Sequence, residues 1–164
     1  MTAIAIRNFR PGDEPALRAV FHASVHWLAC KNYTAEQLAA WAPLHHDAAQ
    51  WAQRMQANQP FIAQAQGRGA IAGFADLQAS GTIDMFFVAP AFAGQGVARA
   101  LMAHVHAQAA QRGITALQAH VSLTAEPFFA AQGFVVEQRQ EVVRTGVVLR
   151  NARMAKVLGS RDSS

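Results

Sequence analysis

Two glycines, Gly94 and Gly96, lie between an apolar run and an amphipathic segment, and this arrangement can bind an anion. The apolar run ends at Val88, and Pro90 marks a bend before the glycines. Glycine lets the backbone turn freely and approach a ligand closely. The free amides at the start of the following helix, together with its positive dipole end, attract negative charge. The segment therefore predicts a main-chain site for a pyrophosphate group.

The glycine pair is a weak signal by itself, because glycines before a helix also occur in other phosphate loops and in ordinary turns. A nucleoside-triphosphate loop would add a Lys-Ser or Lys-Thr pair, and a dinucleotide fingerprint would need three spaced glycines. The sequence has neither pattern around these glycines. Both alternatives are weakened, while plain turn chemistry stays open.

A second block, residues 122–134, combines with the first into a known pattern. Residues 93–98 resemble motif A of the GNAT superfamily of acetyl-CoA-dependent N-acetyltransferases, (Q/R)-x-x-G-x-(G/A), and residues 122–134 resemble its motif B, N-x-x-A-x-x-F-Y-x-x-x-G-F. The matching positions are Gly96, Ala98, Ala125, Phe128, Gly133 and Phe134. Three positions depart from the motifs: Ala93 replaces Arg or Gln, Ser122 replaces Asn, and Phe129 replaces Tyr.

Further segments extend the resemblance over nearly the whole chain. Residues 33–42, 83–85 and 150–154 are similar to the YafP-like bacterial branch of the superfamily. The resemblance implies an α/β fold whose mixed, mostly antiparallel central sheet splays between its fourth and fifth strands and is flanked by helices. It also implies that acetyl-CoA binds in the splay as a cosubstrate. The acetyl group would pass directly to a primary amine of a small molecule or peptide in a ternary complex, without a covalent enzyme intermediate.

The resemblance also assigns the contacts of the cofactor. Amides of residues 93–99 would hold the pyrophosphate, with Arg99 as a substitute for the side chain that Ala93 lacks, and residues 86–88 would line the pantetheine and acetyl groups. The expected cofactor contacts are Phe86, Phe87, Val88, Ala93, Gly94, Gln95, Gly96, Val97, Ala98, Arg99, Ser122, Phe128 and Phe129.

Asp84 is the candidate general base, because superfamily members often carry an acid at this point of the fourth strand. Strand alternation would place it on the same side as Phe86 and Val88, and burial would raise its pKa and make it a better base. Two alternatives stay open: Asp84 ties down the turn at Gly81 and Thr82, or it is a counterion for the substrate ammonium.

The general acid of the family has no counterpart here, because Phe129 replaces the tyrosine that protonates departing CoA. A thiol has a pKa of about 8.5, so its thiolate can leave without an obligatory acid. Tyr33, the one tyrosine of the chain, is a candidate catalytic and substrate-binding residue above the acceptor pocket, and Trp27 and Trp41 are candidate substrate contacts. The alternative for all three is core packing.

The spacing of the histidines and of the single cysteine argues against a metal site. His22 and His26 share a predicted helix face, and residues 45–47 form a His-His-Asp cluster, but no further ligands recur at metal-binding spacing. We therefore expect no metal. His26 or His120 could reach the cleft as an alternative base. Cys30, in an apolar helix, is expected to be a buried thiol.

The whole chain fits one domain. Its 164 residues suffice for a full core, and we expect a single domain over residues 1–158 and a flexible tail over residues 159–164. No apolar run approaches the ~20 residues of a membrane span, and no signal peptide is evident, so cytoplasmic residence without a membrane partner is expected. The net charge of +4 is spread along the chain, which argues against a nucleic-acid partner. A homodimer stays open.

The elements that must position these residues are expected in the order β-α-α-α-β-β-β-α-β-α-β-β, in a single mixed sheet. Thr34 and Gln37 form a capping-box pattern at the start of the second helix. Gly113 is expected to end the helix that follows the paired glycines. The expected strands cover residues 3–9, 61–66, 70–77, 82–88, 115–121, 134–143 and 146–156, and the expected helices begin near residues 13, 34, 47, 97 and 124.

A catalytically silent, CoA-binding regulatory module is the alternative function. Two departures from the motifs motivate it: Ala93 lacks the functional group of Arg or Gln, and Phe129 lacks the hydroxyl of Tyr. Thiol release in the presence of amines would separate it from an enzyme.

Overall fold

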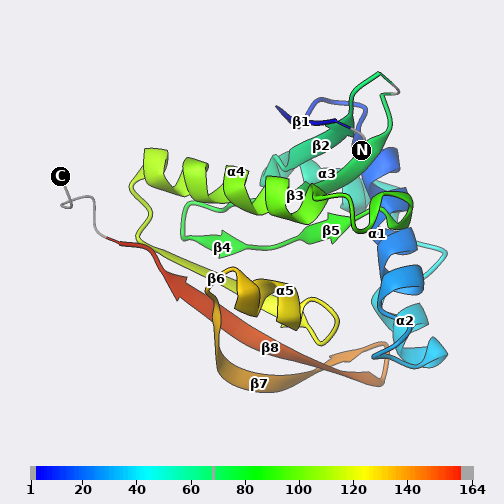
Figure 1. Cartoon of the computed structure of the whole chain (residues 1–164). Coiled ribbons are helices and arrows are strands. Elements are labelled where there is room, and N and C mark those ends of the chain that lie inside the picture. Colours follow the sequence, from blue (N-terminus) through cyan, green and yellow to red (C-terminus); the bar gives the residue numbers. More distant parts are fainter. Residues whose placement is uncertain (1–2, 68, 160–164) are drawn as a thin grey trace.

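The computed structural model describes residues 3–67 and 69–159, and it arranges them around two sheets that diverge from each other (Figure 1). The first sheet has the strand order β1-β2-β3-β5, and all its neighbours are antiparallel. Its strands are β1 (Ile4–Asn8), β2 (Phe61–Ala65), β3 (Ile71–Ala75) and β5 (Phe86–Val88). Helices cover both faces of this sheet, and its inner strands β2 and β3 are largely buried.

The second sheet has the strand order β4-β6-β8-β7. Its strands are β4 (Thr82–Ile83), β6 (Ala116–Ser122), β7 (Val135–Arg144) and β8 (Val147–Val157). The short β4 pairs with β6 in parallel, and the other pairs are antiparallel. The helix α5 (Glu126–Ala131) connects β6 to β7. The expected single sheet is thus divided into two, with β5 in one and β6 in the other. This is the point at which the resemblance to the superfamily implies a splay.

The helices divide the core into two clusters on opposite faces of the first sheet. The helix α4 (Val97–Arg112) packs on one face through Val97, Leu101 and Val105. The other face is covered by α1 (Glu14–Leu28), α2 (Ala35–Trp41) and α3 (Ala48–Asn58). Alternate residues of β2 feed the two clusters, as a period of two requires.

Local signals fix where the helices begin and end. Thr34 Oγ1 accepts a hydrogen bond from the Gln37 amide at 3.1 Å, and Gln37 Oε1 accepts one from the Thr34 amide at 2.8 Å, which confirms the predicted capping box. Asp47 Oδ1 caps α3 through the Gln50 amide at 3.0 Å. Gly113 ends α4 with φ of 70°, a left-handed conformation that glycine adopts without steric cost.

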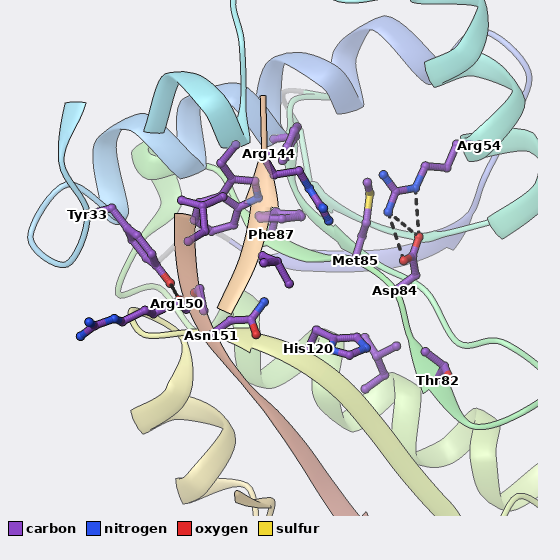
Figure 2. Close-up of a pocket in the computed structure, with 16 residues that line it drawn as sticks. Tyr33, Arg54, Thr82, Asp84, Met85, Phe87, His120, Arg144, Arg150 and Asn151 are labelled. Carbon is purple, nitrogen blue, oxygen red and sulfur yellow. Dashed lines mark hydrogen bonds and ion pairs between the residues drawn. The ribbon is translucent and has the colours of Figure 1, made fainter. Parts of the chain in front are cut away.

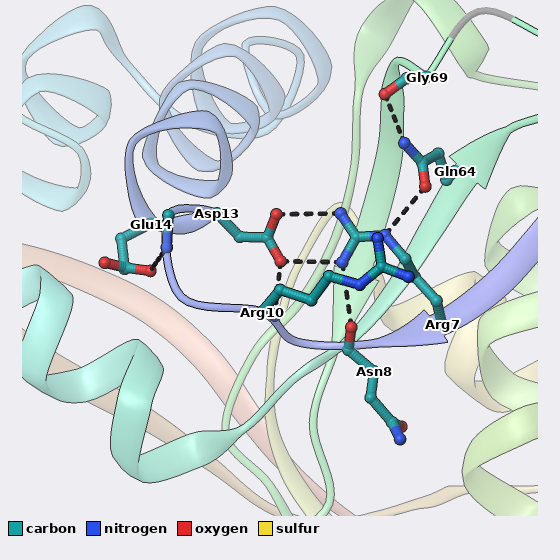
Figure 3. Close-up of polar contacts among 8 residues, drawn as sticks. Arg7, Asn8, Arg10, Asp13, Glu14, Gln64 and Gly69 are labelled. Carbon is teal, nitrogen blue, oxygen red and sulfur yellow. Dashed lines mark hydrogen bonds and ion pairs between the residues drawn. The ribbon is translucent and has the colours of Figure 1, made fainter.

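A bidentate ion pair ties β1 to the start of α1 (Figure 3). The Arg7 guanidinium donates to both oxygens of Asp13 at 2.9 Å and to Gln64 Oε1 at 2.9 Å. This hydrogen-bonded guanidinium lowers the pKa of Asp13 despite its partial burial. The pair thereby holds the first connection of the chain against β2.

The strand expected over residues 82–88 is interrupted, which corrects the predicted element order. The carboxylate of Asp76 accepts hydrogen bonds from the main-chain amides of Asp84 at 2.7 Å and Met85 at 3.1 Å. These bonds replace ladder bonds, so the chain bulges between Ile83 and Phe86. As a result β4 pairs with β6, whereas β5 pairs with β3.

One further expectation is contradicted by the structure, and another lies mostly outside the described residues. Cys30 lies just past the end of α1 and is exposed, so the expectation of a buried thiol is wrong. The expected tail lies outside the described residues apart from Gly159, and the single-domain division stays a prediction. In the described part of the chain, every helix is too short or too polar to cross a membrane.

Candidate active site

Two cavities open at the splay between β5 and β6, and they share the side chains of Trp41, Phe87 and Ser122. One, of about 200 Å³, is lined mainly by apolar side chains from α1, β5, α4 and α5, and is called the apolar cavity below. The other, of about 340 Å³, is lined by several charged side chains and is called the polar cavity (Figure 2). Two ligands, one bound in each cavity, would therefore lie next to each other at the shared wall.

The apolar cavity gathers seven of the expected cofactor contacts. These are Phe86, Phe87, Val88, Ala98, Ser122, Phe128 and Phe129. The ring of Phe129 is 3% exposed and packs edge-on against Phe86 at 5.5 Å and Phe134 at 5.0 Å between ring centroids. A phenyl ring in this position supplies packing and shape to the cavity but no proton.

The remaining expected cofactor contacts form the turn before α4. Gly94 and Gly96 have φ of 76° and 84°, in the left-handed region, and a Cβ added at either glycine would meet no atom within 4 Å. The main chain is thus open to a ligand at this turn. The amide of Ala100 donates to the Gly96 carbonyl, and the amides of residues 97–99 precede this first helical bond. Among the side chains, that of Val97 is buried in the core, so only its main chain faces outward.

Asp84 lies in the polar cavity, but on a different side from the one expected. Ile83, Phe86 and Val88 pack in the cluster with α4, whereas Met85 and Phe87 pack in the cluster with α1 and α3. The Asp84 carboxylate bonds to two side chains of α3, so it lies on that second side. The expectation that strand alternation places Asp84 with Phe86 and Val88 is wrong, because the bulge at residues 84–85 breaks the alternation.

The carboxylate of Asp84 is exposed and engaged rather than buried. It accepts hydrogen bonds from the Arg54 guanidinium at 2.9 to 3.1 Å and from Asn58 Nδ2 at 2.7 Å. Its side chain is 36% exposed. The expected burial is therefore wrong, and the carboxylate already has a cationic partner in the protein. Its role as a counterion for the substrate ammonium stays a prediction.

Asp76 is the residue that the sequence analysis missed. Its side chain is fully buried, and Oδ2 also accepts a hydrogen bond from Asn58 Nδ2 at 3.2 Å. Burial raises its pKa to about 6, and the hydrogen bond from the Asp84 amide acts in the opposite direction. A lone carboxylate inside the apolar run of residues 70–77 was the available signal, because a buried acid requires specific partners.

Tyr33 braces the site instead of pointing a free hydroxyl into it. Its hydroxyl donates to the Arg150 carbonyl at 2.5 Å and accepts from the Leu123 amide at 2.9 Å. Burial raises the pKa of this phenol. Tyr33 lines the polar cavity and packs against Trp41, with ring centroids 5.5 Å apart. The side chain therefore joins the connection between α1 and α2 to β8 and to the loop after β6.

The structure separates the two tryptophans that were expected to bind substrate. Trp41 lines both cavities at their shared wall. Trp27 is 74% exposed and contributes to neither of these two cavities. Its place on the outer side of α1 gives it no contact with the gathered site residues.

Other polar groups of the polar cavity come from the second sheet. His120 of β6 lies in the lining and contacts the Gln140 side chain through Nδ1. Arg144 at the end of β7 and Arg150 in the first half of β8 were not expected as site residues, because nothing local in the sequence brings them to β5. His26, the other alternative base, bonds instead to the Ala42 carbonyl at 2.8 Å. Among the described residues no cluster of three potential metal ligands forms.

A splayed mixed sheet, a glycine turn before α4 and paired cavities at the splay together define an acyl-CoA-dependent acyltransferase architecture. The family model described as "Acetyltransferase (GNAT) domain" matches residues 29–158, and the chain therefore belongs to the GNAT family of N-acetyltransferases.

Three known proteins are similar to this chain. "Uncharacterized N-acetyltransferase YafP" of Escherichia coli (strain K12) is 33% identical over 156 residues, which cover 94% of this chain and 96% of that protein. A crystal structure of a GCN5-related N-acetyltransferase from Rhodopseudomonas palustris has 34% identity and a TM-score of 0.89, and the match covers 96% of this chain and 98% of that one. YncA from Salmonella typhimurium, solved with its cofactor acetyl-CoA, has 20% identity and a TM-score of 0.71, with 98% of this chain and 97% of that one covered.

Proposed function

We propose that this acetyltransferase moves the acetyl group of acetyl-CoA directly to a primary amine of a small molecule or peptide while both substrates are bound. The observation that carries the proposal is the meeting of the two cavities at Trp41, Phe87 and Ser122. A thioester in the apolar cavity and an amine in the polar cavity would be neighbours at this wall. Holding two reactants in contact is itself a large part of the rate enhancement.

The turn of residues 93–99 would hold the pyrophosphate of the cofactor. Its support is the open main chain at Gly94 and Gly96 and the start of the 16-residue helix α4, which offers free amides and a positive dipole end. The pantetheine and acetyl groups would then lie in the apolar cavity against Phe86, Val88 and Phe128. YncA, which shares this fold, was solved with acetyl-CoA as its cofactor.

Asp84 and His120 are the two groups of the polar cavity that can remove a proton from the acceptor ammonium. Asp84 Oδ2 receives three of the four hydrogen bonds from Arg54 and Asn58, whereas Oδ1 receives one and keeps capacity for a substrate or water. We retain Asp84 as the proposed base, acting directly or through water, and His120 as its alternative.

Departure of the CoA thiolate needs no acid from Phe129. A thiol has a pKa of about 8.5, so the thiolate is a stable enough leaving group near neutral pH. Tyr33 is not proposed as a substitute acid, because its hydroxyl proton is used in the bond to the Arg150 carbonyl.

Incubation of the protein with acetyl-CoA and a panel of amines, peptides and amino antibiotics tests the proposal, with free CoA thiol as the readout. We expect thiol release that depends on an acceptor, together with an acetylated product detected by mass. Tight CoA binding without acceptor-dependent release would instead support the silent regulatory module, which the phenyl ring of Phe129 and the absent side chain at Ala93 favour.

A further inference from the structure

We propose that the acceptor amine also carries an anionic group, a carboxylate or a phosphate-type group, and that this group binds the guanidinium of Arg144 in the polar cavity. This inference rests on the proposed function, because it concerns the second substrate of the same reaction. It names a substrate class that the fold leaves open.

The charges that line the polar cavity do not balance. Three arginines, Arg54, Arg144 and Arg150, are among the lining residues, but only one acid, Asp84, and Figure 2 shows the guanidinium of Arg150 pointing away from the other labelled residues. Asp84 is held by Arg54 in a bidentate pair. Arg150 faces Glu141 at 3.5 Å, and the side chains of both are mainly exposed. Positive charge therefore remains in excess inside the cavity.

Arg144 accounts for this excess. Within residues 3–67 and 69–159 it forms no ion pair, and its guanidinium has one weak hydrogen bond, to the Val143 carbonyl at 3.4 Å. In Figure 2 the guanidinium extends from the end of β7 toward Phe87 and Met85. A planar guanidinium with free donors recognises carboxylate and phosphate oxygens in a bidentate geometry.

A second cation lies behind the wall of the same cavity. Arg18 is 7% exposed, its guanidinium carbon lies 5.1 Å from the ring centroid of Phe21, and Phe21 lines the cavity. Within the described residues Arg18 has no carboxylate partner, and Nη2 donates to the Pro43 carbonyl. Its positive field adds to that of Arg144.

The rest of the lining indicates what the acceptor contains besides its amine and its anionic group. The lining also contains apolar side chains: those of Trp41 and Phe87 at the shared wall, and those of Met85 and Leu149 elsewhere in the cavity. The volume of about 340 Å³ is at the small end of the range of ligand pockets. The acceptor that fits is a small amino acid-like molecule with an apolar side chain, its amine at Phe87 and Ser122 and its anion at Arg144.

Matched acceptor pairs that differ in the anionic group test the inference. L-phenylalanine against phenethylamine probes a carboxylate, and 2-aminoethyl phosphate against ethanolamine probes a phosphate. We expect kcat/KM at least tenfold higher for the anionic member of at least one pair, and we expect Arg144→Gln to remove this preference while leaving KM for acetyl-CoA unchanged. Arg144→Lys should keep part of the preference, because the charge remains and the bidentate geometry is lost. Arg139→Gln is the matched control, an exposed arginine on the same strand outside the cavity lining, and should keep the wild-type preference.

Three results would overturn the inference while acetyl transfer itself stands. The first is equal use of anionic and neutral amines, the second is an anion preference that survives in Arg144→Gln, and the third is a raised KM for acetyl-CoA alone in that variant. If no amine is acetylated at all, the proposed function fails, and the inference is judged by binding. NMR titration would then compare N-acetyl-phenylalanine with N-acetyl-phenethylamine on the wild type and on Arg144→Gln. Anion-dependent binding that is lost in the variant supports it, and any other pattern refutes it.

Discussion

At the scale of single residues, the site depends on two carboxylates with different tasks. Asp76 is buried and bonds to main-chain amides, whereas Asp84 is partly exposed and bonds to Arg54 and Asn58. Asn58 donates to both carboxylates and so links them. The buried Asp76 holds the main chain at residues 84 and 85 in place, and the partly exposed Asp84 lines the polar cavity.

We expect Asp84→Asn to retain acetyl-CoA binding but to lower kcat at least tenfold and to shift the pH profile, because a proton acceptor would be lost. Steady-state kinetics across pH 6 to 9, with calorimetry for the cofactor, measure both effects. Glu137→Gln, which removes another exposed ion-paired carboxylate, is the control for the loss of charge. Unchanged kinetics in Asp84→Asn, with the profile altered by His120→Gln instead, would assign the base to His120.

Asp76 predicts a specific dependence of stability on pH. Its pKa in the folded protein is about 6, above the value of 3.8 for an unperturbed aspartate, so the folded state binds this proton more tightly than the unfolded state. The free energy of unfolding should therefore fall, through this group, as pH rises from about 4 to about 6, by at most about 3 kcal/mol.

The variant Asp76→Asn has no proton to lose, so its stability should lack this contribution. Denaturant unfolding at pH 4 and pH 7 would show that the stability of the wild type relative to the variant declines between the two values. A difference in stability between the two proteins that is the same at pH 4 and pH 7 would show that folding does not raise the pKa of Asp76. The comparison of two proteins cancels the opposite contribution of Asp13, whose pKa is lowered by Arg7.

At the scale of elements, the local patterns of the sequence were enough to place the helices and most strands. The capping box at Thr34, the cap at Asp47 and the left-handed Gly113 are decided by neighbours within one turn, so the sequence exposes them. The bulge that divides β4 from β5 is decided by Asp76, eight residues from Asp84, and period-two alternation contains no trace of it. The face occupied by Asp84 was mispredicted for the same reason.

The candidate site follows the same division. The glycine turn and seven residues of the apolar cavity stand in or next to the two motifs, so the sequence could name them, whereas Ser24, Val25 and Leu28 of α1 line the same cavity and were not expected. Arg144 and Arg150 reach the polar cavity only through the long pairing of β7 with β8, a tertiary fact without a local pattern. Tyr33 could be named, but its two hydrogen bonds to distant main-chain atoms could not.

We expect Tyr33→Phe to lower stability more than catalysis. The variant leaves the Leu123 amide and the Arg150 carbonyl without their partner, which costs about 1–3 kcal/mol for a buried group. Thermal unfolding should show this loss, while kcat at 25 °C changes less than threefold. A large loss of kcat at unchanged stability would return Tyr33 to the catalytic machinery.

At the scale of the whole molecule, two cavities meet at one wall where the two sheets diverge. The turn before α4 supplies the paired glycines, residues of α1, β5, α4 and α5 line the apolar cavity, and residues of both sheets together with Arg54 of α3 line the polar cavity. The proposed direct transfer requires both substrates to be bound at this wall at the same time.

The pattern of initial rates distinguishes direct transfer from transfer through the enzyme. Acetyl-CoA and the best acceptor are varied against each other, and the mass of the intact protein is measured after incubation with acetyl-CoA alone. For direct transfer we expect double-reciprocal lines that intersect and a protein mass that does not change. Parallel lines together with a protein heavier by one acetyl group would contradict it, because they would show that the acetyl group passes through the enzyme.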